Sequence, residues 1–222
     1  MGAYLGNTEI GQMYLGSTEI AEAYLGSTKV YQKLPYDAQV EYLQSSGTQY
    51  IDTGFVPNNE SGFYVRSYCS ISGGTNICLG VRENSSTQSR WWINFSSFIE
   101  FGWNEWESSG ITNSANNWVE VENNFLNKRV GKIDGINRKT KYSTLETITR
   151  CAYIFGTNLG GDVAYSFRGK ISNVKISQGT EIVMDFIPVR VGSTGYMYDK
   201  VSNQLFGNAG TGSFTLGNDI TT

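Results

Sequence analysis

The stretch RWWINFSSFIEFGWNEW (residues 90–106) decides the fold, because its first strand-like segment alternates between two sets of side chains. Trp91, Ile93 and Phe95 fall on one side of an extended chain, and Trp92 and Asn94 fall on the other. A period of two residues is typical of a β-strand, and the Ser-Ser pair that follows indicates a turn into a second strand. The stretch therefore predicts a hairpin that buries Trp91, Ile93 and Phe95 and directs Trp92 and Asn94 outward.

Segments of the same kind fill the chain from residue 34 to residue 222. Between Ile133 and Ile136 stands an Asp-Gly pair, which is a strong signal for a two-residue hairpin turn. Other predicted strands are QYIDTGF (49–55), GFYVRSYCSI (62–71), TNICLGV (75–81), NWVEVENN (117–124), CAYIFGT (151–157), FRGKISNVKI (167–176) and TEIVMDFIPV (180–189). So many short strands without a convincing helix predict an all-β domain, a two-sheet sandwich over residues 34–222.

A tandem repeat precedes this region: AYLGNTEIGQ, MYLGSTEIAE and AYLGSTKVYQ occupy residues 3–32. Gly-Asn and Gly-Ser between strand-forming residues are typical of two-residue type II′ turns, in which Gly supplies the positive φ. The repeat therefore predicts an antiparallel β-meander over residues 1–33, with Leu15 opposite Thr18. An extended Gly/Ser/Thr linker is the alternative, although linkers seldom carry large apolar residues at regular spacing.

Both faces of the predicted meander carry apolar side chains, and a small isolated sheet is marginal in water. We therefore expect the repeats to mediate assembly, either as a homo-oligomer, with a trimer favoured, or by attachment to another protein. The candidate assembly residues are Tyr4, Leu5, Tyr14, Leu15, Tyr24 and Leu25.

Composition narrows the class of partner. The 222 residues carry a net charge of −3 with no basic stripe, which argues against nucleic acid. No apolar run approaches the roughly 20 residues of a membrane span. The N-terminus shows no basic region followed by an apolar one, so we expect synthesis in a cytosol without a secretory signal.

The chain contains few of the residue combinations that enzymatic catalysis requires. There is no histidine, which excludes Ser-His-Asp and Cys-His catalysis and every His-containing zinc site. Glu105 and Glu107 form a carboxylate pair that a glycosidase could use, but we expect them to be solvated charges. A hairpin turning at Gly73-Gly74 could place Cys69 near Cys78, yet the apolar pattern favours a different register and free, buried thiols. We predict no enzyme activity, no cofactor and no metal site.

Five tryptophans fall within 28 residues, from Trp91 to Trp118. Each taken singly is more simply a core residue of a sandwich. As a group they also suggest a recognition surface, because a sugar ring needs a flat apolar partner with polar groups beside it. Trp92 and Asn94 point away from the predicted core, and Trp106 lies near the end of the next strand. These three residues are the predicted carbohydrate-binding site.

Four segments carry a family resemblance: VEYLQSSGTQYIDTGFVPNN, the Asp-Gly hairpin, SFRGKISNVKISQGTEIVMDFIPVR and YMYDKVSNQLFGNAGTGSF. Over roughly residues 36–216 they resemble laminin-G-like members of the concanavalin A-like lectin and glucanase superfamily. The sequences of these segments resemble the versions found in bacteriophage structural proteins and gut-bacterial surface proteins. The YLGST repeats resemble those of phage virion proteins. The three-carboxylate strand of the superfamily's glucanases is missing here.

The resemblance implies a jelly-roll sandwich that binds glycans without cleaving them. It implies a virion accessory protein, of the fibre or decoration type, that recognises host-surface polysaccharide. Its repeats would contact other virion proteins. A location on a bacterial cell surface is the alternative. A purely structural decoration protein without a ligand and, less favoured, a glycoside hydrolase are the alternative functions.

Overall fold

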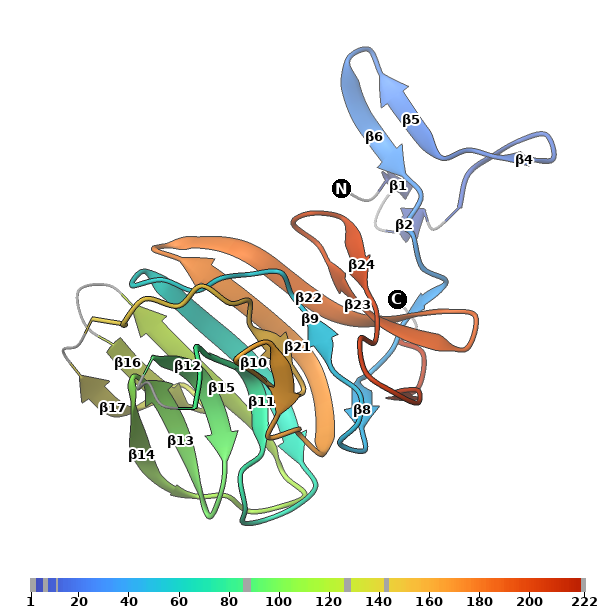
Figure 1. Cartoon of the computed structure of the whole chain (residues 1–222). Coiled ribbons are helices and arrows are strands. Elements are labelled where there is room, and N and C mark those ends of the chain that lie inside the picture. The colour runs from blue at the N-terminus through green and yellow to red at the C-terminus, as the bar shows by residue number, and fades with distance from the viewer. Residues whose placement is uncertain are drawn as a thin grey trace.

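A computed structural model describes residues 3–5, 8–10, 12–85, 89–125, 129–141 and 144–220. Of residues 3–5, 8, 9, 124 and 125 it describes the backbone alone. The described chain is all-β and contains no helix. Two large, mostly antiparallel sheets pack face to face, and three short hairpins at the N-terminus project from one end (Figure 1). The predicted fold class, an all-β sandwich, is confirmed.

The larger sheet has eleven strands, eight of them in the order β17-β16-β15-β10-β21-β22-β23-β24. The other three, β7, β8 and β25, pair onto β22, β21 and β8 respectively. Its strands are β7 (Ala38–Gln39), β8 (Leu43–Ser45), β10 (Ser61–Cys69), β15 (Trp118–Phe125), β16 (Arg129–Ile133), β17 (Ile136–Lys141), β21 (Gly169–Gln178), β22 (Glu181–Val191), β23 (Thr194–Asp199), β24 (Gln204–Phe206) and β25 (Thr215–Leu216).

The smaller sheet has eight strands, six of them in the order β14-β13-β12-β11-β18-β9. The remaining two, β19 and β20, join through β11. Its strands are β9 (Ile51–Asp52), β11 (Ile77–Arg82), β12 (Arg90–Phe95), β13 (Phe98–Trp103), β14 (Glu105–Thr112), β18 (Tyr153–Ile154), β19 (Thr157–Leu159) and β20 (Asp162–Ala164).

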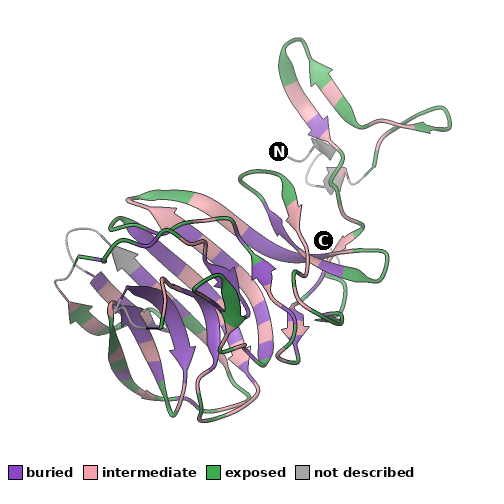
Figure 2. Cartoon of the chain, in the orientation of Figure 1, coloured by how far each residue is buried: buried purple, intermediate pink, exposed green. Residues whose placement is uncertain are grey.

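The core lies between the two sheets, where the inward faces of both are buried (Figure 2). As predicted, Trp91, Ile93 and Phe95 of β12 are fully buried in it. The ring of Trp91 meets that of Phe63 from β10 edge to face, with centroids 4.9 Å apart. Because aromatic rings remove large apolar areas from water, contacts of this kind across the interface stabilise the sandwich.

The hairpin between β16 and β17 turns as the sequence predicts. Ile133 pairs with Ile136, and both turn residues have positive φ, 49° at Asp134 and 76° at Gly135. This is the type I′ geometry that an Asp-Gly pair favours.

The interpretation of a hairpin between residues 69 and 78 is wrong, because the two strands lie in opposite sheets. Cys69 ends β10 and pairs with Gly169 of β21, whereas Cys78 belongs to β11, which pairs with β12. Both strands are apolar on the side that faces the core, so each is buried best against the other sheet rather than beside the other strand. All three cysteines are free, as predicted. Cys69 and Cys78 are buried as predicted, but the expectation that Cys151 is also buried is wrong, because it is partly exposed.

The repeat region forms three separate two-stranded hairpins: β1 (Ala3–Leu5) with β2 (Thr8–Ile10), β3 (Tyr14–Leu15) with β4 (Thr18–Glu19), and β5 (Glu22–Leu25) with β6 (Thr28–Gln32). Leu15 faces Thr18 as predicted, and Gly16 supplies a φ of 65° in the turn. Each run of eight residues between turns is divided into two strands, so the predicted continuous meander is not formed. We call residues 3–33 the arm.

The two ends of the sandwich segment are fastened together. The guanidinium of Arg190 in β22 donates two hydrogen bonds to the carboxylate of Asp219, at 2.7 and 2.6 Å. Val40 forms a β-bridge with Asp219, and β25 pairs with β8. The chain therefore enters the sandwich next to the place where it ends.

Candidate functional site

Trp92 occupies the face of β12 that looks away from the core, as the alternation predicts, but it is not exposed. Only 1% of its surface is accessible. The rings of Trp106 and Tyr165 approach it edge-on, with centroids 6.3 and 6.4 Å away, and the guanidinium of Arg90 lies 5.0 Å from its ring. The expectation of an outward, accessible Trp92 is wrong because neighbouring side chains cover the face on which it lies.

Asn94 is also buried, at 0% exposure, and its polar atoms are already bonded. Its amide oxygen accepts the backbone N–H of Asn76 at 2.8 Å, and its amide nitrogen donates to Glu100 at 2.7 Å. A buried amide with partners of this kind holds a β-sheet face together and has little left to offer a ligand. The predicted ligand-facing position of Asn94 is therefore wrong.

Trp106 is exposed, with half of its surface accessible, and Tyr165 beside it is 40% exposed. Trp106 is the second residue of the edge strand β14, so it lies near a strand end, as predicted. The two exposed rings flank the buried edge of Trp92 on the outer face of the smaller sheet. Trp92, Trp106, Tyr165 and Arg90 are called the tryptophan patch.

A glycine makes the tryptophan patch geometrically possible. Across three neighbouring strands Trp92 pairs with Gly102, and Gly102 pairs with Trp106. A Cβ atom on Gly102 would stand 2.3 Å from Cδ1 of Trp92, well inside van der Waals contact. Because the middle position has no side chain, the buried indole of Trp92 and the exposed indole of Trp106 meet edge to face over β13.

Two arginines, Arg90 in the tryptophan patch and Arg82 next to it, place positive charge at this site. Arg82 and Arg90 are directly opposite each other on β11 and β12. Burial lowers the pKa of Arg90 from its usual value, and the positive charge of Arg82 lowers it further. Tyr165 and Glu105 have the opposite, smaller effect and raise that pKa. The patch thus combines two exposed rings with a buried guanidinium beside Trp92, which is an arrangement suited to binding rather than to proton transfer.

The carboxylates that a glycosidase would need are engaged in ion pairs. Nζ of Lys141 lies 2.9 Å from the carboxylate of Glu105 and 2.5 Å from that of Glu107, and Lys139 contacts Glu107 at 2.9 Å. Burial raises the pKa of Glu107, but the two lysines outweigh it and hold that pKa below its ordinary value. A general acid needs a raised pKa, so this pair is a poor fit to glycoside cleavage.

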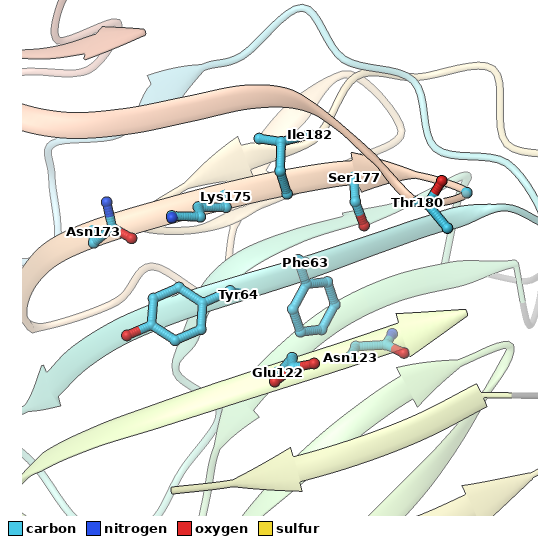
Figure 3. A pocket seen from close by; sticks show the side chains of 10 residues that line it. Phe63, Tyr64, Glu122, Asn123, Asn173, Lys175, Ser177, Thr180 and Ile182 are labelled. Atoms are coloured by element: carbon cyan, nitrogen blue, oxygen red, sulfur yellow. The ribbon is translucent and has the colours of Figure 1, made fainter. Parts of the chain in front are cut away.

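A groove that the sequence did not reveal lies on the outer face of the larger sheet (Figure 3). Its cavity volume is about 460 Å³, within the range of ligand pockets. The residues that line it include Tyr64 of β10, Glu122 of β15, Asn173, Lys175 and Ser177 of β21, and Ile182 of β22. Burial and the neighbouring Glu120 raise the pKa of Tyr64 to about 12, so its hydroxyl stays protonated. The alternation of Tyr64, Arg66 and Tyr68 was a signal for this face, but finding the groove required the strand register.

Neither a metal centre nor a membrane-spanning helix is found in the described residues. No group of three or more Cys, Asp or Glu side chains there comes close enough to hold a metal ion. No helix there is long and apolar enough to cross a membrane.

No family model and no curated protein matches the chain. Solved structures do match it. A crystal structure of a candidate carbohydrate-binding protein from Bacteroides ovatus is 13% identical, with a TM-score of 0.58, and the match covers 92% of this chain and 67% of that one. The CBM40 of the Ruminococcus gnavus IT-sialidase, bound to alpha2,6 sialyllactose, is 14% identical, with a TM-score of 0.49 and coverage of 62% and 90%.

A third match is domain 4 of AbnA, an extracellular arabinanase from Geobacillus stearothermophilus, in complex with arabinotriose. It is 13% identical, with a TM-score of 0.46, and the match covers 71% of this chain and 74% of that one. At these identities the comparison with the Bacteroides ovatus protein shows a shared β-sandwich fold.

Proposed function

We propose that the protein binds glycans without cleaving them, through the tryptophan patch. The observation that carries the proposal is the pair of exposed rings, Trp106 and Tyr165, on either side of the buried Trp92. Exposed aromatic rings held by a rigid sheet offer the flat apolar faces on which sugar rings stack. The likeness in fold to the candidate carbohydrate-binding protein of Bacteroides ovatus supports the same reading. Of the three residues predicted from the sequence, Trp106 is the one that a ligand can reach directly.

The biological setting belongs to the same proposal. The repeats and the sequence resemblance support a virion accessory protein that recognises host-surface polysaccharide, with the arm joining it to copies of itself or to other virion proteins. Tyr14, Leu15, Tyr24 and Leu25 are exposed in the structure, the two leucines at 77% each. The side chains of Tyr4 and Leu5 lie outside those that the structure describes. Large apolar side chains exposed at matching places in two successive hairpins are a surface that assembly would cover.

A glycan array probed with the full-length protein tests the binding function. We expect saturable retention on bacterial surface polysaccharide, with no release of reducing sugar. Trp106→Ala should weaken retention about fivefold, the loss of roughly 1 kcal/mol of aromatic contact. Phe98→Ala is the matched control, because Phe98 is an exposed aromatic residue of the same sheet outside the patch.

Two results of this array would favour another function. Silence across bacterial polysaccharides would support a purely structural decoration protein. Sugar release that disappears in Glu105→Gln would support a glycoside hydrolase.

Light scattering tests the role of the arm. The double variant Leu15→Ser, Leu25→Ser should lower the mass in solution from that of an oligomer, a trimer in our proposal, to that of a monomer. A monomeric mass for the unaltered protein would exclude self-assembly and leave attachment to another protein.

A further inference from the structure

The groove is one end of a longer surface on the outer face of the larger sheet. In this part of the sheet β10 pairs with β15 on one side and with β21 on the other, and the register to β21 shifts once, at a β-bulge between Arg66 and Ser67. Trp118, Tyr68 and Lys170 form one cross-strand row, and Glu122, Tyr64 and Lys175 form another. The seven residues from Gly62 to Tyr68 are separated by six steps, which correspond to roughly 20 Å at the usual rise of a β-strand. This face is therefore long enough for an extended chain rather than a single small molecule.

Aromatic rings and cations alternate at the end far from the cavity. Nζ of Lys170 lies 4.2 Å from the ring centroid of Tyr42 and 4.9 Å from that of Tyr68. The guanidinium of Arg66 lies 4.6 Å from the ring of Trp118, which in turn stands 5.7 Å from the ring of Tyr68. Cation–π contacts of this kind fix the positions of the rings and the charges together.

Hydrogen-bonding groups gather at the other end, in the cavity itself. Figure 3 shows Tyr64 on β10, Lys175 and Ser177 on β21 and Glu122 on β15 around the same space. The cavity thus combines a phenol ring, an ammonium group and a hydroxyl, which can bind both the apolar face and the polar edge of a ligand.

The charges of this face are unequally matched. Its acidic side chains have cationic partners: Arg66 pairs with Glu120 at 3.7 Å, Lys132 with Glu122 at 2.8 Å, and Lys200 with Asp185 at 2.9 Å. Lys170 and Lys175, both on β21, form no ion pair with any residue in the described ranges. The ammonium groups of Lys170 and Lys175 therefore give the face that carries the groove an excess of positive charge, although the net charge of the protein is −3.

We propose that this face is a second binding surface, independent of the tryptophan patch, for an extended polysaccharide that carries negative charges. The sugar rings lie against Tyr64, Tyr68 and Trp118, and the acidic groups reach Lys170 and Lys175. The two surfaces are the outer faces of opposite sheets, so one protein molecule binds two glycan chains at once.

Binding of the full-length protein to soluble polymers tests this proposal. The probes are polygalacturonate, which carries carboxylates, dextran sulfate, which carries sulfates, and neutral dextran. We expect binding to one or both anionic polymers, weakening as NaCl shortens the screening length, and none to dextran. Which polymer binds more tightly distinguishes carboxylate from sulfate as the recognised group.

Charge variants assign the binding to this face. Lys170→Gln and Lys175→Gln should each weaken binding of the anionic polymer about two- to fivefold, as loss of a partly exposed ion pair does. Arg138→Gln removes the same charge from an exposed position on β17 and should leave binding unchanged. Trp106→Ala should also leave it unchanged.

Three results would overturn the proposal: no binding of either anionic polymer, equal binding of dextran, or equal loss in Arg138→Gln. Retention of other glycans through Trp106 in any of these cases would leave the proposed function standing. A loss of anionic-polymer binding in Trp106→Ala as large as in the lysine variants would mean one site instead of two.

Discussion

Truncation of Trp92 should lower the stability of the fold strongly, whereas truncation of Trp106 should lower it little, although the two rings contact each other. Trp92 is 1% exposed, so Trp92→Ala removes almost the whole buried area of an indole, about 200 Å². At roughly 25 cal/mol per Å² this corresponds to about 5 kcal/mol as an upper value, and measured truncations of buried aromatic residues cost about 3–5 kcal/mol. Trp106 keeps half of its surface in water, so Trp106→Ala should cost no more than half of that upper value, about 2.5 kcal/mol.

Urea unfolding followed by circular dichroism measures both changes, and glycan retention is measured on the same preparations. We expect Trp92→Ala to lower the midpoint strongly and Trp106→Ala to lower it little while weakening retention. Trp91→Ala, in the core on the other face of β12, is the control for a large loss of stability. A Trp92→Ala protein as stable as the unaltered one would refute the reasoning that neighbouring side chains cover the indole and make it part of the fold.

Three further predictions concern stability alone. Asn123 is buried with both polar side-chain atoms unpartnered among the described residues, so Asn123→Leu should raise the free energy of unfolding by about 1 kcal/mol in urea titration, and a decrease would mean that the amide is satisfied in solution. Gly135 has a φ of 76°, so Gly135→Ala should lower the free energy of unfolding by about 1 kcal/mol, and an unchanged value would contradict the type I′ turn. The pKa of Glu107 is held below its ordinary value, because Lys141 and Lys139 outweigh the opposing effect of burial, so the ionised group stabilises the fold above its ordinary pKa and this contribution is lost as pH falls through the lowered one. Glu107→Gln should therefore flatten the acid limb of a stability–pH profile, and an unchanged limb would contradict the ion pairs.

The parts of the fold that follow from local pattern could be predicted. The alternation around Trp91 identified the core face of β12, and the Asp-Gly pair identified the turn between β16 and β17. Both depend on residues close in the sequence, where the period of a strand and the φ of a turn leave little choice. The pairing of β10 could not be found this way, because its partners, β15 and β21, lie about 50 and 110 residues further along the chain.

The prediction of the candidate site was wrong for the same reason, because the site also depends on contacts between residues far apart in the sequence. Alternation correctly placed Trp92 and Asn94 on the face away from the core, but it does not tell whether a face is covered. Tyr165, which lies far from both in the sequence, supplies part of the cover of Trp92. Gly102 lets Trp106 supply another part, and Arg90 lies against the same ring. Exposure is a property of what packs on a strand from elsewhere, so it requires the register of the whole sheet.

The contacts that join Val40 and Arg190 to Asp219 determine how the sandwich would carry a mechanical load. Any pull on the arm reaches the sandwich first at Tyr36 and Asp37, which contact Tyr198 and Arg190, and then at β7 and β8, which are antiparallel to β22, β21 and β25. A tension along β8 acts in shear on its hydrogen bonds to both neighbours, and the bidentate contact between Arg190 and Asp219 holds the last segment in place beside them. Bonds loaded in shear share the force instead of opening one after another. A sandwich pulled along β8 would thus resist more force than one whose strands are peeled apart one after another.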